Sequence, residues 1–322
     1  MALRNIVRLV HMAPPIKDLK GKKVLVTGAA SGIGRATANL LAAHDAELVL
    51  TDINAEQLDA VTRHVTALGA KVIASRAFDV SDYDAVRAFA DEVHAAAGPL
   101  DVVMNVAGIA VWGTVENLTH EQWRRTVDVN LMGPIHVIET FLPPMIAAGR
   151  GGQLVNVSST AGLIALPWHA AYSAAKFGLV GVSEVLRYDL RRHGIGVSVV
   201  VPGAVETGLV KTVEINGVDR SNPKVNKGID AFPKVTAEKA AQAIIDGVLH
   251  NVYEFPEHVG VAVTSRLKIL GRLNVAEKRR PQDGRIKTRK PDNREVELRL
   301  APMPTAFGEK MVMRIFDPDV LL

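Results

Sequence analysis

The chain of 322 residues contains no cysteine. This absence excludes disulfide bonds, zinc sites built on thiolates and cysteine nucleophiles. No metal site is expected in the chain. A reducing cytoplasm is the natural setting for such a composition, and a cytoplasmic location is expected, although a cysteine-free chain is compatible with any compartment.

Long apolar runs are also missing. No stretch of about 18 apolar residues occurs, so no integral membrane segment is expected. The first residues, MALRNIVRLV, form a short basic amphipathic patch without the apolar centre and cleavage pattern of a signal peptide. Residues 1–18 are interpreted as a frayed arm, with a membrane-surface anchor as the alternative.

Aromatic residues are scarce, at 5% of the chain, whereas 48% of the residues are hydrophobic. This balance favours an aliphatic α/β interior. The net charge of +4 is unevenly distributed, because residues 264–322 carry 14 Lys and Arg against 8 Asp and Glu, while residues 1–263 carry 24 against 26. Nucleic-acid surfaces combine such charge with aromatic side chains, and this tail has only Phe307 and Phe316. A solvated basic face is preferred, and no nucleic-acid partner is expected.

Short apolar runs alternate with amphipathic helical stretches over most of the chain. Strands are predicted at 23–27, 48–51, 72–77, 102–105, 153–157 and 197–201, with helices between them. This alternation predicts parallel strands joined by right-handed crossovers, hence a doubly wound, Rossmann-like α/β sheet. Ligands of such sheets bind beyond the carboxyl ends of the strands, and the candidate site residues fall there.

The stretch TGAASGIG (27–34) follows the first predicted strand and opens a helix. Gly28, Gly32 and Gly34 allow a sharp turn, with Ser31 and Ile33 among them, and the free amides at the helix end attract a pyrophosphate. The spacing is GxxxGxG rather than GxGxxG, so the standard dinucleotide fingerprint is met only loosely. A glycine-rich turn without a ligand is the alternative.

Asp52 stands at the end of the second predicted strand, eighteen residues after Gly34. A carboxylate there accepts hydrogen bonds from the ribose hydroxyls of an adenosine and repels a 2′-phosphate. No lysine or arginine follows at Ile53 or Asn54, so NAD is favoured over NADP as the cofactor. Asp79 is a candidate partner for the adenine amino group, or else belongs to the start of a helix.

Tyr172 and Lys176 lie four residues apart in a predicted helix, and Ser159 lies thirteen residues before Tyr172. One face of a helix carries positions i and i+4 together, so the phenol and the ammonium are expected to be neighbours. A free tyrosine titrates at about pH 10, and an adjacent positive charge favours the phenolate. We therefore expect a lowered pKa for Tyr172, which would make it a general acid/base near neutral pH.

This ordered set resembles the classical branch of the short-chain dehydrogenase/reductase family over about residues 19–249. The resemblance implies hydride transfer between NAD(H) and the carbon of an alcohol or ketone. It assigns Ser159 to the substrate oxygen, Tyr172 to proton transfer, and Lys176 to lowering the tyrosine pKa and binding the nicotinamide ribose. Asn130 would position a water of a proton relay, and Thr207 would hold the nicotinamide carboxamide.

The resemblance also implies which residues hold the cofactor. They are Gly28, Ser31, Gly32, Ile33, Gly34, Asp52, Asp79, Val80, Asn105, Ala107, Gly108, Tyr172, Lys176, Pro202, Gly203, Val205 and Thr207. The sequence departs from the family at Val106, where a second asparagine is usual, and it lacks the Gly-rich closing strand, for which NVYEF (251–255) is a shorter candidate. Because the family often assembles as dimers or tetramers, a homo-oligomer is expected.

Apolar residues follow the Pro202-Gly203 turn, where the family places its substrate lid. They are Leu209, Val210, Val213, Ile215, Val218, Ile229 and Phe232, and further apolar candidates are Trp112, Leu163, Ile164, Leu166 and Trp168. This composition favours an apolar secondary alcohol or ketone as the small-molecule substrate. The alternative is that these residues simply close the core.

Residues 256–322 do not continue the doubly wound pattern. A short helix (SRLKIL), strand-like runs at 286–290 and 295–300 around a Pro-Asp-Asn turn, and the alternating run GEKMVMRIFD predict a small α+β appendage. The expected organisation is an arm (1–18), an NAD-binding dehydrogenase domain (19–255) and this basic C-terminal segment (256–322).

Residues 245–322 resemble the segment before the nucleotide-binding core of bacterial type II secretion and type IV pilus-assembly ATPases, through IDGVLH, AEKRRPQDGRI, RLAPMPT and GEKMVMRIFD. In that family two arginines, matched by Arg299 and Arg314, reach a nucleotide bound by a neighbouring domain. No GxxxxGK[ST] loop occurs in the chain, so ATPase activity is not carried over. A passive appendage is favoured. The alternative function is a dehydrogenase-like scaffold whose tail docks to a secretion or pilus-assembly machine.

Overall fold

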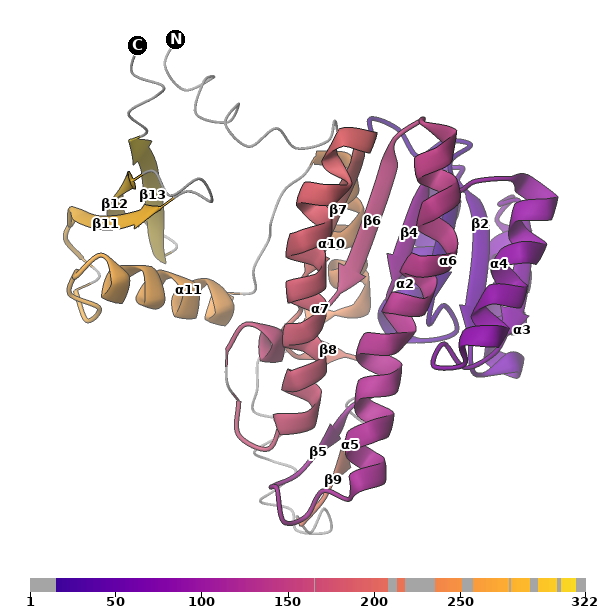
Figure 1. Ribbon diagram of the computed structural model, residues 1–322, viewed down its shortest axis with the longest axis horizontal. Helices are drawn as coiled ribbons and strands as arrows, with labels where there is room; N and C mark the ends of the chain where they lie inside the picture. The colour runs from indigo at the N-terminus through magenta and orange to yellow at the C-terminus, as the bar shows by residue number, and fades with distance from the viewer. Residues whose placement is uncertain are drawn as a thin grey trace. The chain divides into compact units, whose positions relative to one another are not determined.

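The computed structural model describes residues 16–164, 166–207, 213–217, 235–250, 257–277, 279–289, 295–305 and 308–316. The chain divides into two compact units, one spanning Met12–Glu254 and the other containing Phe255–Leu322 (Figure 1). The candidate closing strand at 251–255 lies outside the described residues. Each unit is described by itself.

A six-stranded parallel sheet forms the centre of the first unit, in the order β3-β2-β1-β4-β6-β7. Its strands are β1 (Lys23–Thr27), β2 (Glu47–Asp52), β3 (Val72–Ala77), β4 (Val102–Asn105), β6 (Gly152–Val157) and β7 (Ile195–Val200). This arrangement confirms the predicted doubly wound, Rossmann-like sheet. The strand order reverses between β1 and β4, which is the place where such sheets bind their ligands.

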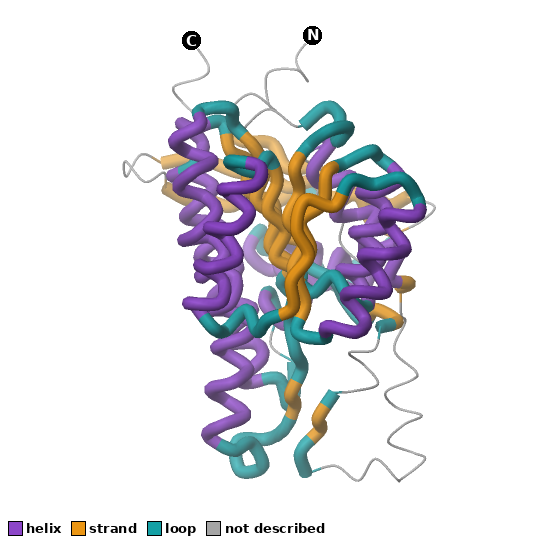
Figure 2. Tube along the Cα trace, turned by 90° about the vertical axis from the view of Figure 1, so that its right-hand side faces the viewer, coloured by secondary structure: helices purple, strands orange, loops and turns teal. Residues whose placement is uncertain are grey.

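Helices cover both faces of this sheet, as Figure 2 shows. One face packs against α2 (Gly32–Ala43), α3 (Ala55–Ala67) and α10 (Ala237–His250), and the other against α4 (Tyr83–Ala97), α6 (Gly133–Ala148) and α7 (Ala170–Asp189). Because both faces are covered, the central strands β1, β2 and β4 are mostly apolar rather than alternating.

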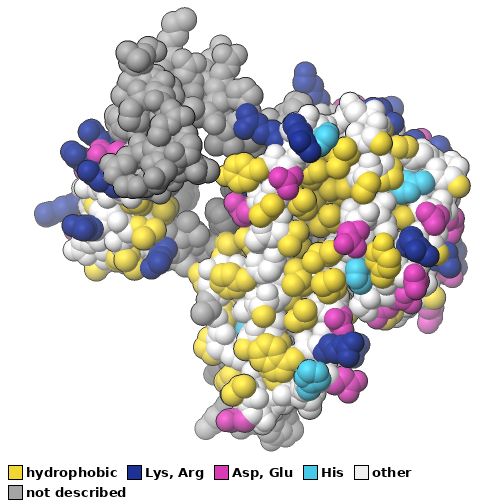
Figure 3. Space-filling model, in the orientation of Figure 1, with side chains coloured by type: hydrophobic (Ala, Val, Ile, Leu, Met, Phe, Trp, Pro, Cys, Tyr) yellow, Lys and Arg dark blue, Asp and Glu magenta, His cyan; other side chains and the backbone are white. Residues whose placement is uncertain are grey.

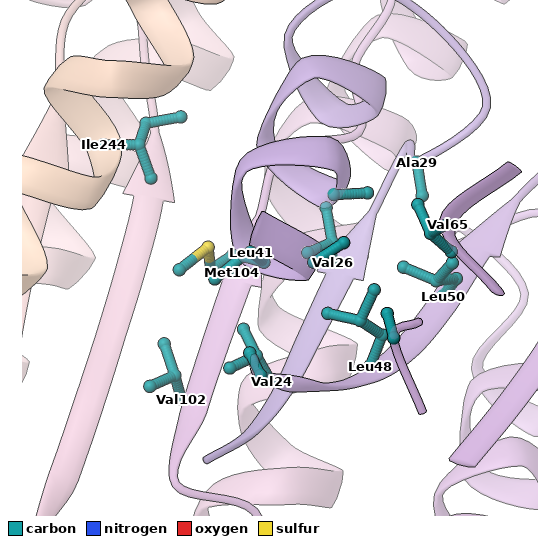
Figure 4. Close-up of a cluster of buried hydrophobic side chains, with 14 of the residues drawn as sticks. Val24, Val26, Ala29, Leu41, Leu48, Leu50, Val65, Val102, Met104 and Ile244 are labelled. Carbon is teal, nitrogen blue, oxygen red and sulfur yellow. The ribbon is translucent and has the colours of Figure 1, made fainter. Parts of the chain in front are cut away.

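The core on the α2 side is aliphatic, as the low aromatic content predicts. Val24 and Val26 of β1 cluster with Leu48 and Leu50 of β2 and with Leu41 of α2 (Figure 4). The alternate β1 residue, Leu25, faces the other layer and belongs to a separate buried cluster. Strand alternation therefore divides one short sequence between two cores.

The longest helical stretch among the described residues consists of three consecutive elements. Helix α5 (His120–Val127) starts at a capping box in which Thr119 and Gln122 exchange hydrogen bonds of 3.2 and 3.0 Å, and the π-helical turn η2 (Asp128–Met132) joins it to α6. Among the described residues, His120–Ala148 is the one stretch that length and composition would allow to cross a membrane. Its residues Val137 and Phe141 are buried in the core, so these criteria are also met by an ordinary core helix. The absence of a membrane segment stays a prediction.

Two short parallel pairs complete the first unit. They are β5 (Val111–Trp112) with β9 (Glu214–Ile215), and β8 (Val205–Glu206) with β10 (Val235–Thr236). No strand is predicted at β5 from the sequence. Its strand character comes from a partner far along the chain, which local pattern does not reveal.

The second unit contains α11 (Glu257–Leu270) and a three-stranded antiparallel sheet in the order β11-β12-β13. The strands are β11 (Gly284–Arg289), β12 (Glu295–Thr305) and β13 (Gly308–Phe316). Leu300 is fully buried, and a Cβ on Gly271 would lie 2.8 Å from its Cδ1, so the end of the helix lies close to the sheet. The helix and the three strands follow the predicted α+β pattern.

Candidate active site

The loop between β1 and α2 has no room for a side chain at its glycine positions. Gly28 and Gly32 have φ of +67° and +50°, in the left-handed region that favours glycine. A Cβ on Gly34 would lie 1.9 Å from the Gly28 carbonyl oxygen, which no side chain allows. Ser31 stands at the N-cap of α2, and its side chain makes no capping hydrogen bond. The open turn before the helix amides fits a pyrophosphate.

Two further segments return to this loop. Thr27 Oγ1 accepts hydrogen bonds from the amides of Val106 and Ala107, at 3.0 and 3.1 Å, which ties the end of β1 to the loop after β4. A Cβ on Gly32 would lie 3.0 Å from the methyl of Thr207, so the segment after β7 reaches the same place. These contacts bring together loops that are far apart in sequence.

The other predicted cofactor residues lie around this edge in supporting positions. Ile33 is half-buried against the core of the α2 side. Pro202 accepts a hydrogen bond from the Thr160 amide at 3.0 Å, with half-buried Gly203 next to it, and Val205 is buried in β8.

Two backbone amides fix the orientation of the Asp52 carboxylate. Its Oδ2 accepts from the Ala30 amide at 2.9 Å, and its Oδ1 accepts from the Asn54 amide at 3.0 Å. The carboxylate thus lies against the glycine loop at the end of β2, where an adenosine ribose is expected. Ile53 beside it is 66% exposed and brings no positive charge.

Asp79 and Val80 shape a turn. Asp79 Oδ1 accepts from the amide and the hydroxyl of Ser81, at 2.9 and 2.7 Å. Val80 is buried against Gly133, whose Cβ would lie 2.8 Å from the valine Cγ2. These bonds support the reading of Asp79 as part of a helix start, although the N-cap of α4 itself is Asp82.

Asn105 ends β4 but directs its amide into the core. Its Nδ2 donates to Asn156 Oδ1 at 2.9 Å, Asn156 Nδ2 donates to Ser183 Oγ at 2.9 Å, and Ser183 Oγ donates to Leu179 O at 2.6 Å. All three side chains are buried. This network joins β4, β6 and α7, and neither Asn156 nor Ser183 was identified from the sequence. A polar residue within the apolar run LVNVSS was the available signal.

Tyr172 and Lys176 are brought together on α7, as predicted. Lys176 Nζ lies 5.8 Å from the centre of the Tyr172 ring and donates to Val157 O at 3.0 Å. The Lys176 carbonyl accepts from Ser158 Oγ at 3.0 Å, so one residue of α7 is held to the end of β6 at two atoms. Ser159, the next residue, hydrogen-bonds the Tyr172 side chain.

Asn130 lies in the π-helical turn η2 and is fully buried. Its Nδ2 donates to Ile109 O and Thr126 O, each at 3.0 Å, and its Oδ1 accepts from the Ile109 amide at 3.1 Å. A Cβ on Gly108 would lie 2.7 Å from that oxygen and 3.6 Å from Lys176 Nζ. Both amide hydrogens are used, so a relay water could bond the side chain only at the remaining lone pair of Oδ1.

The lowered pKa expected for Tyr172 is not found in the protein without a bound cofactor. Burial raises the pKa of Tyr172, and the hydrogen bond from Ser159 lowers it by less. Burial also lowers the pKa of Lys176 from 10.5 to about 8. The physical reason is that desolvation disfavours both charged forms, and the ammonium bonds a backbone carbonyl rather than the phenol oxygen. Sequence spacing predicts proximity, but it does not weigh burial against charge.

The substrate side is apolar around Tyr172. Ala110, Ala161, Val213 and Ile215 form a buried cluster with it, and Trp112 and Leu166 pack against this cluster. Leu163 and Ile164 are half-buried and Trp168 is 49% exposed. The other predicted lid residues, at 209, 210, 218, 229 and 232, lie outside the described residues.

Comparison with known proteins identifies this arrangement. The family model for short chain dehydrogenase matches residues 22–216. The chain belongs to the short-chain dehydrogenase family. It is 38% identical to SadH of Mycobacterium tuberculosis over 240 residues, which cover 72% of this chain and 84% of SadH. It is 41% identical to D-threitol dehydrogenase of Mycolicibacterium smegmatis over 193 residues, covering 59% and 73% of the two chains.

A solved structure agrees with the fold. The crystal structure of a short chain dehydrogenase/reductase from Burkholderia phymatum in complex with NAD superposes with a TM-score of 0.70 at 27% identity, covering 81% of this chain and 99% of that one. The protein is therefore an oxidoreductase of a family that binds NAD(P), and the glycine loop described above fits such a cofactor.

The C-terminal part matches a second family. The model for Type II/IV secretion system protein covers residues 235–321. The type IV pilus assembly ATPase TfpB of Acinetobacter baylyi is 69% identical over 78 residues, which make up 24% of this chain and 13% of TfpB. The resemblance read from the sequence is confirmed in both parts of the chain.

The buried charge of Lys176 predicts a pH-dependent effect of Lys176→Met on stability. The folded pKa, about 8, lies below the ordinary 10.5, so between these values the unfolded chain binds more protons. The free energy of unfolding of the wild type therefore rises by about 3 kcal/mol between pH 8 and pH 10.5. Below pH 8 the full cost of burying the charge lowers this free energy. The variant lacks this rise.

Urea unfolding of both proteins at pH 8 and pH 10.5 measures the effect, because the titrations of groups distant from Lys176 cancel in the difference. Lys71→Met, at a side chain that is 68% exposed, is the matched control and should show no such change. A wild-type-minus-variant stability that stays constant between the two pH values would contradict the burial of the charge.

Proposed function

We propose that the protein is an NAD-dependent dehydrogenase that interconverts a secondary alcohol and its ketone. The observation that carries this proposal is the buried pair of Tyr172 and Lys176, with Ser159 hydrogen-bonded to the tyrosine, at the sheet edge that holds the glycine loop.

In this proposal each side chain has one task. The Ser159 hydroxyl donates to the substrate oxygen. During ketone reduction Tyr172 Oη gives its proton to that oxygen and becomes the phenolate, and during alcohol oxidation the phenolate takes the alcohol proton. When bound, NAD supplies the acceptor for the hydride that leaves the alcohol carbon. Lys176 keeps a positive charge next to the phenol, which favours the phenolate once the proton moves. Asn130 holds the loop at Ile109, beside Lys176.

Cofactor binding is proposed for the glycine loop and the strand ends around it. Gly28, Gly32 and Gly34 allow the tight turn that presents the first amides of α2 to the pyrophosphate, and Asp52 faces the adenosine ribose. A fixed carboxylate with no neighbouring cation at 53 or 54 opposes a 2′-phosphate, which supports NAD over NADP. Thr207, which returns to Gly32, is proposed to bind the nicotinamide carboxamide.

An apolar substrate is proposed from the cluster around Tyr172. Alanine, valine and isoleucine side chains and the Trp112 ring surround the phenol. A homo-oligomer is proposed from α7, whose Phe177, Val185 and Tyr188 are 46%, 60% and 72% exposed. Figure 3 shows hydrophobic side chains spread over the face formed by α6 and α7. A cytoplasmic location is proposed on the absence of cysteine.

Tyr172→Phe is expected to lower kcat by about 10²–10⁴-fold, because the variant keeps the ring but has no proton to exchange. Affinity for NAD, measured by calorimetry, should be nearly unchanged. Tyr188→Phe, at an exposed position on the same helix, is the control and should keep wild-type turnover. Wild-type turnover of secondary alcohols by Tyr172→Phe would refute the assigned role.

Asp52→Ala is expected to reduce the preference for NAD over NADP, since it removes the charge that opposes the 2′-phosphate. The measurement is the ratio of dissociation constants for the two cofactors. Asp84→Ala, at a carboxylate that is 85% exposed on α4, should leave this ratio unchanged. If both variants keep the wild-type ratio, Asp52 does not determine cofactor choice.

A second candidate function rests on the C-terminal unit. The C-terminal part of the chain, which includes the compact unit Phe255–Leu322, is 69% identical to TfpB over 78 residues, and this supports docking of the unit to a pilus-assembly machine. The full chain is expected to retain a type IV pilus assembly ATPase in a pull-down. A chain ending at residue 254 should not retain it but should keep NAD binding. Equal retention by both chains, or by neither, would exclude this function.

A further inference from the structure

Aromatic rings gather beside Tyr172 in a chain that has few of them. The whole sequence contains 3 tryptophans and 4 tyrosines, yet Trp112, Trp168 and His169 all lie at this corner. The ring centroids of Trp112 and His169 are 4.5 Å apart, with an angle of 34° between the ring planes. The centroids of His169 and Tyr172 are 6.2 Å apart, with an angle of 67° between the planes. The rings of Trp112 and His169 therefore form a wall beside the Tyr172 phenol.

This wall is held by backbone hydrogen bonds. Trp112 belongs to β5, which pairs with β9, and its carbonyl accepts from the Asn216 amide at 2.8 Å. The Gly113 amide donates to Trp168 O at 2.8 Å, which fixes the loop before α7. Trp168 has φ of +66°, an unfavourable conformation for a bulky residue. Such strain persists where the surroundings enforce it, and it is common at ligand sites.

The wall has one unused acceptor. His169 Nδ1 lies 2.6 Å from Pro167 O. A carbonyl can only accept, so Nδ1 carries the hydrogen and Nε2 presents a lone pair. Burial lowers the pKa of His169, which keeps the ring neutral near pH 7. No described residue hydrogen-bonds Nε2.

The wall also has one unused donor. The indole Nε1 of Trp112 is buried, and it has no partner among the described residues. A buried donor without a partner is unfavourable and calls for an acceptor. A hydroxyl group accepts from an indole N–H and donates to an imidazole lone pair, so one such group matches both atoms in hydrogen-bond type.

From this geometry we propose that Trp112 and His169 select a ring-bearing secondary alcohol that carries a second hydroxyl group. The flat rings pack against the substrate ring, and the second hydroxyl accepts from Trp112 Nε1 and donates to His169 Nε2. Tyr172 then holds the reacting hydroxyl. This inference rests on the proposed function and adds the substrate class.

The test compares cyclohexanediols with cyclohexanol as substrates of the NAD-bound enzyme. Wild type is expected to prefer a diol in kcat/KM. His169→Phe and Trp112→Phe keep a flat ring but remove the acceptor and the donor, and each should lower the ratio of diol to cyclohexanol by about tenfold, the effect of one hydrogen bond. His64→Phe, at an exposed position on α3, should leave the ratio unchanged.

Binding is measured separately, so that this inference and the proposed function can fail independently. Tryptophan fluorescence of Tyr172→Phe with NAD reports the affinity for diol and cyclohexanol without turnover. Tighter binding of a diol that is lost on adding His169→Phe supports the inference, even if no alcohol is oxidised, which would refute only the proposed function. Equal affinities for every diol and for cyclohexanol, or a diol preference that survives both His169→Phe and Trp112→Phe, would overturn it.

Discussion

The attachment of α7 to β6 is the constraint on which the site depends. Apolar packing alone would let a helix slide or rotate on a sheet, because such contacts have no direction. Here polar groups set the position: Asn156 bonds Ser183, Ser158 bonds the Lys176 carbonyl, and the Lys176 ammonium bonds Val157 O. Tyr172 is one turn away from Lys176, so its place follows from these bonds. The hydrogen bonds between β6 and α7 therefore determine where the side chains of the site lie.

The sequence was most informative where one residue type has one physical use. A glycine at position 34 and the spacing of Tyr172 and Lys176 predict the loop and the pair, and the alternation of strands and helices predicts the sheet. It was less informative where the outcome depends on residues far apart. The β5–β9 pairing and the buried link from Asn105 through Asn156 to Ser183 are of this kind.

The pKa of Tyr172 shows a different limit. Two opposing effects act on the pKa of the phenol, the hydrogen bond from Ser159 and the larger effect of removal from water, and only the serine is visible as a letter in the sequence. The depth of burial is decided by residues such as Ala110, Ala161 and Ile215, which no motif includes. The hydrogen bonds of Asn130 to Ile109 were equally unpredictable, because they depend on a π-helical turn that the sequence pattern does not indicate.

Helix α10 joins the two resemblances. The secretion-family model already begins at residue 235, yet Ile244, Ile245 and Val248 of this helix are fully buried in the dehydrogenase core. The helix thus belongs to the second family by sequence and to the first by packing. A boundary drawn from sequence similarity alone would remove part of the core.

The contact between Gly34 and Gly28 has a consequence for how this chain can change over generations. Every replacement of Gly34 by another amino acid introduces a Cβ, and that atom would lie 1.9 Å from a carbonyl oxygen. Single amino-acid substitutions are therefore not tolerated at this position. A descendant without this glycine would have to rebuild the whole turn in one step, so the loop is inherited intact or lost.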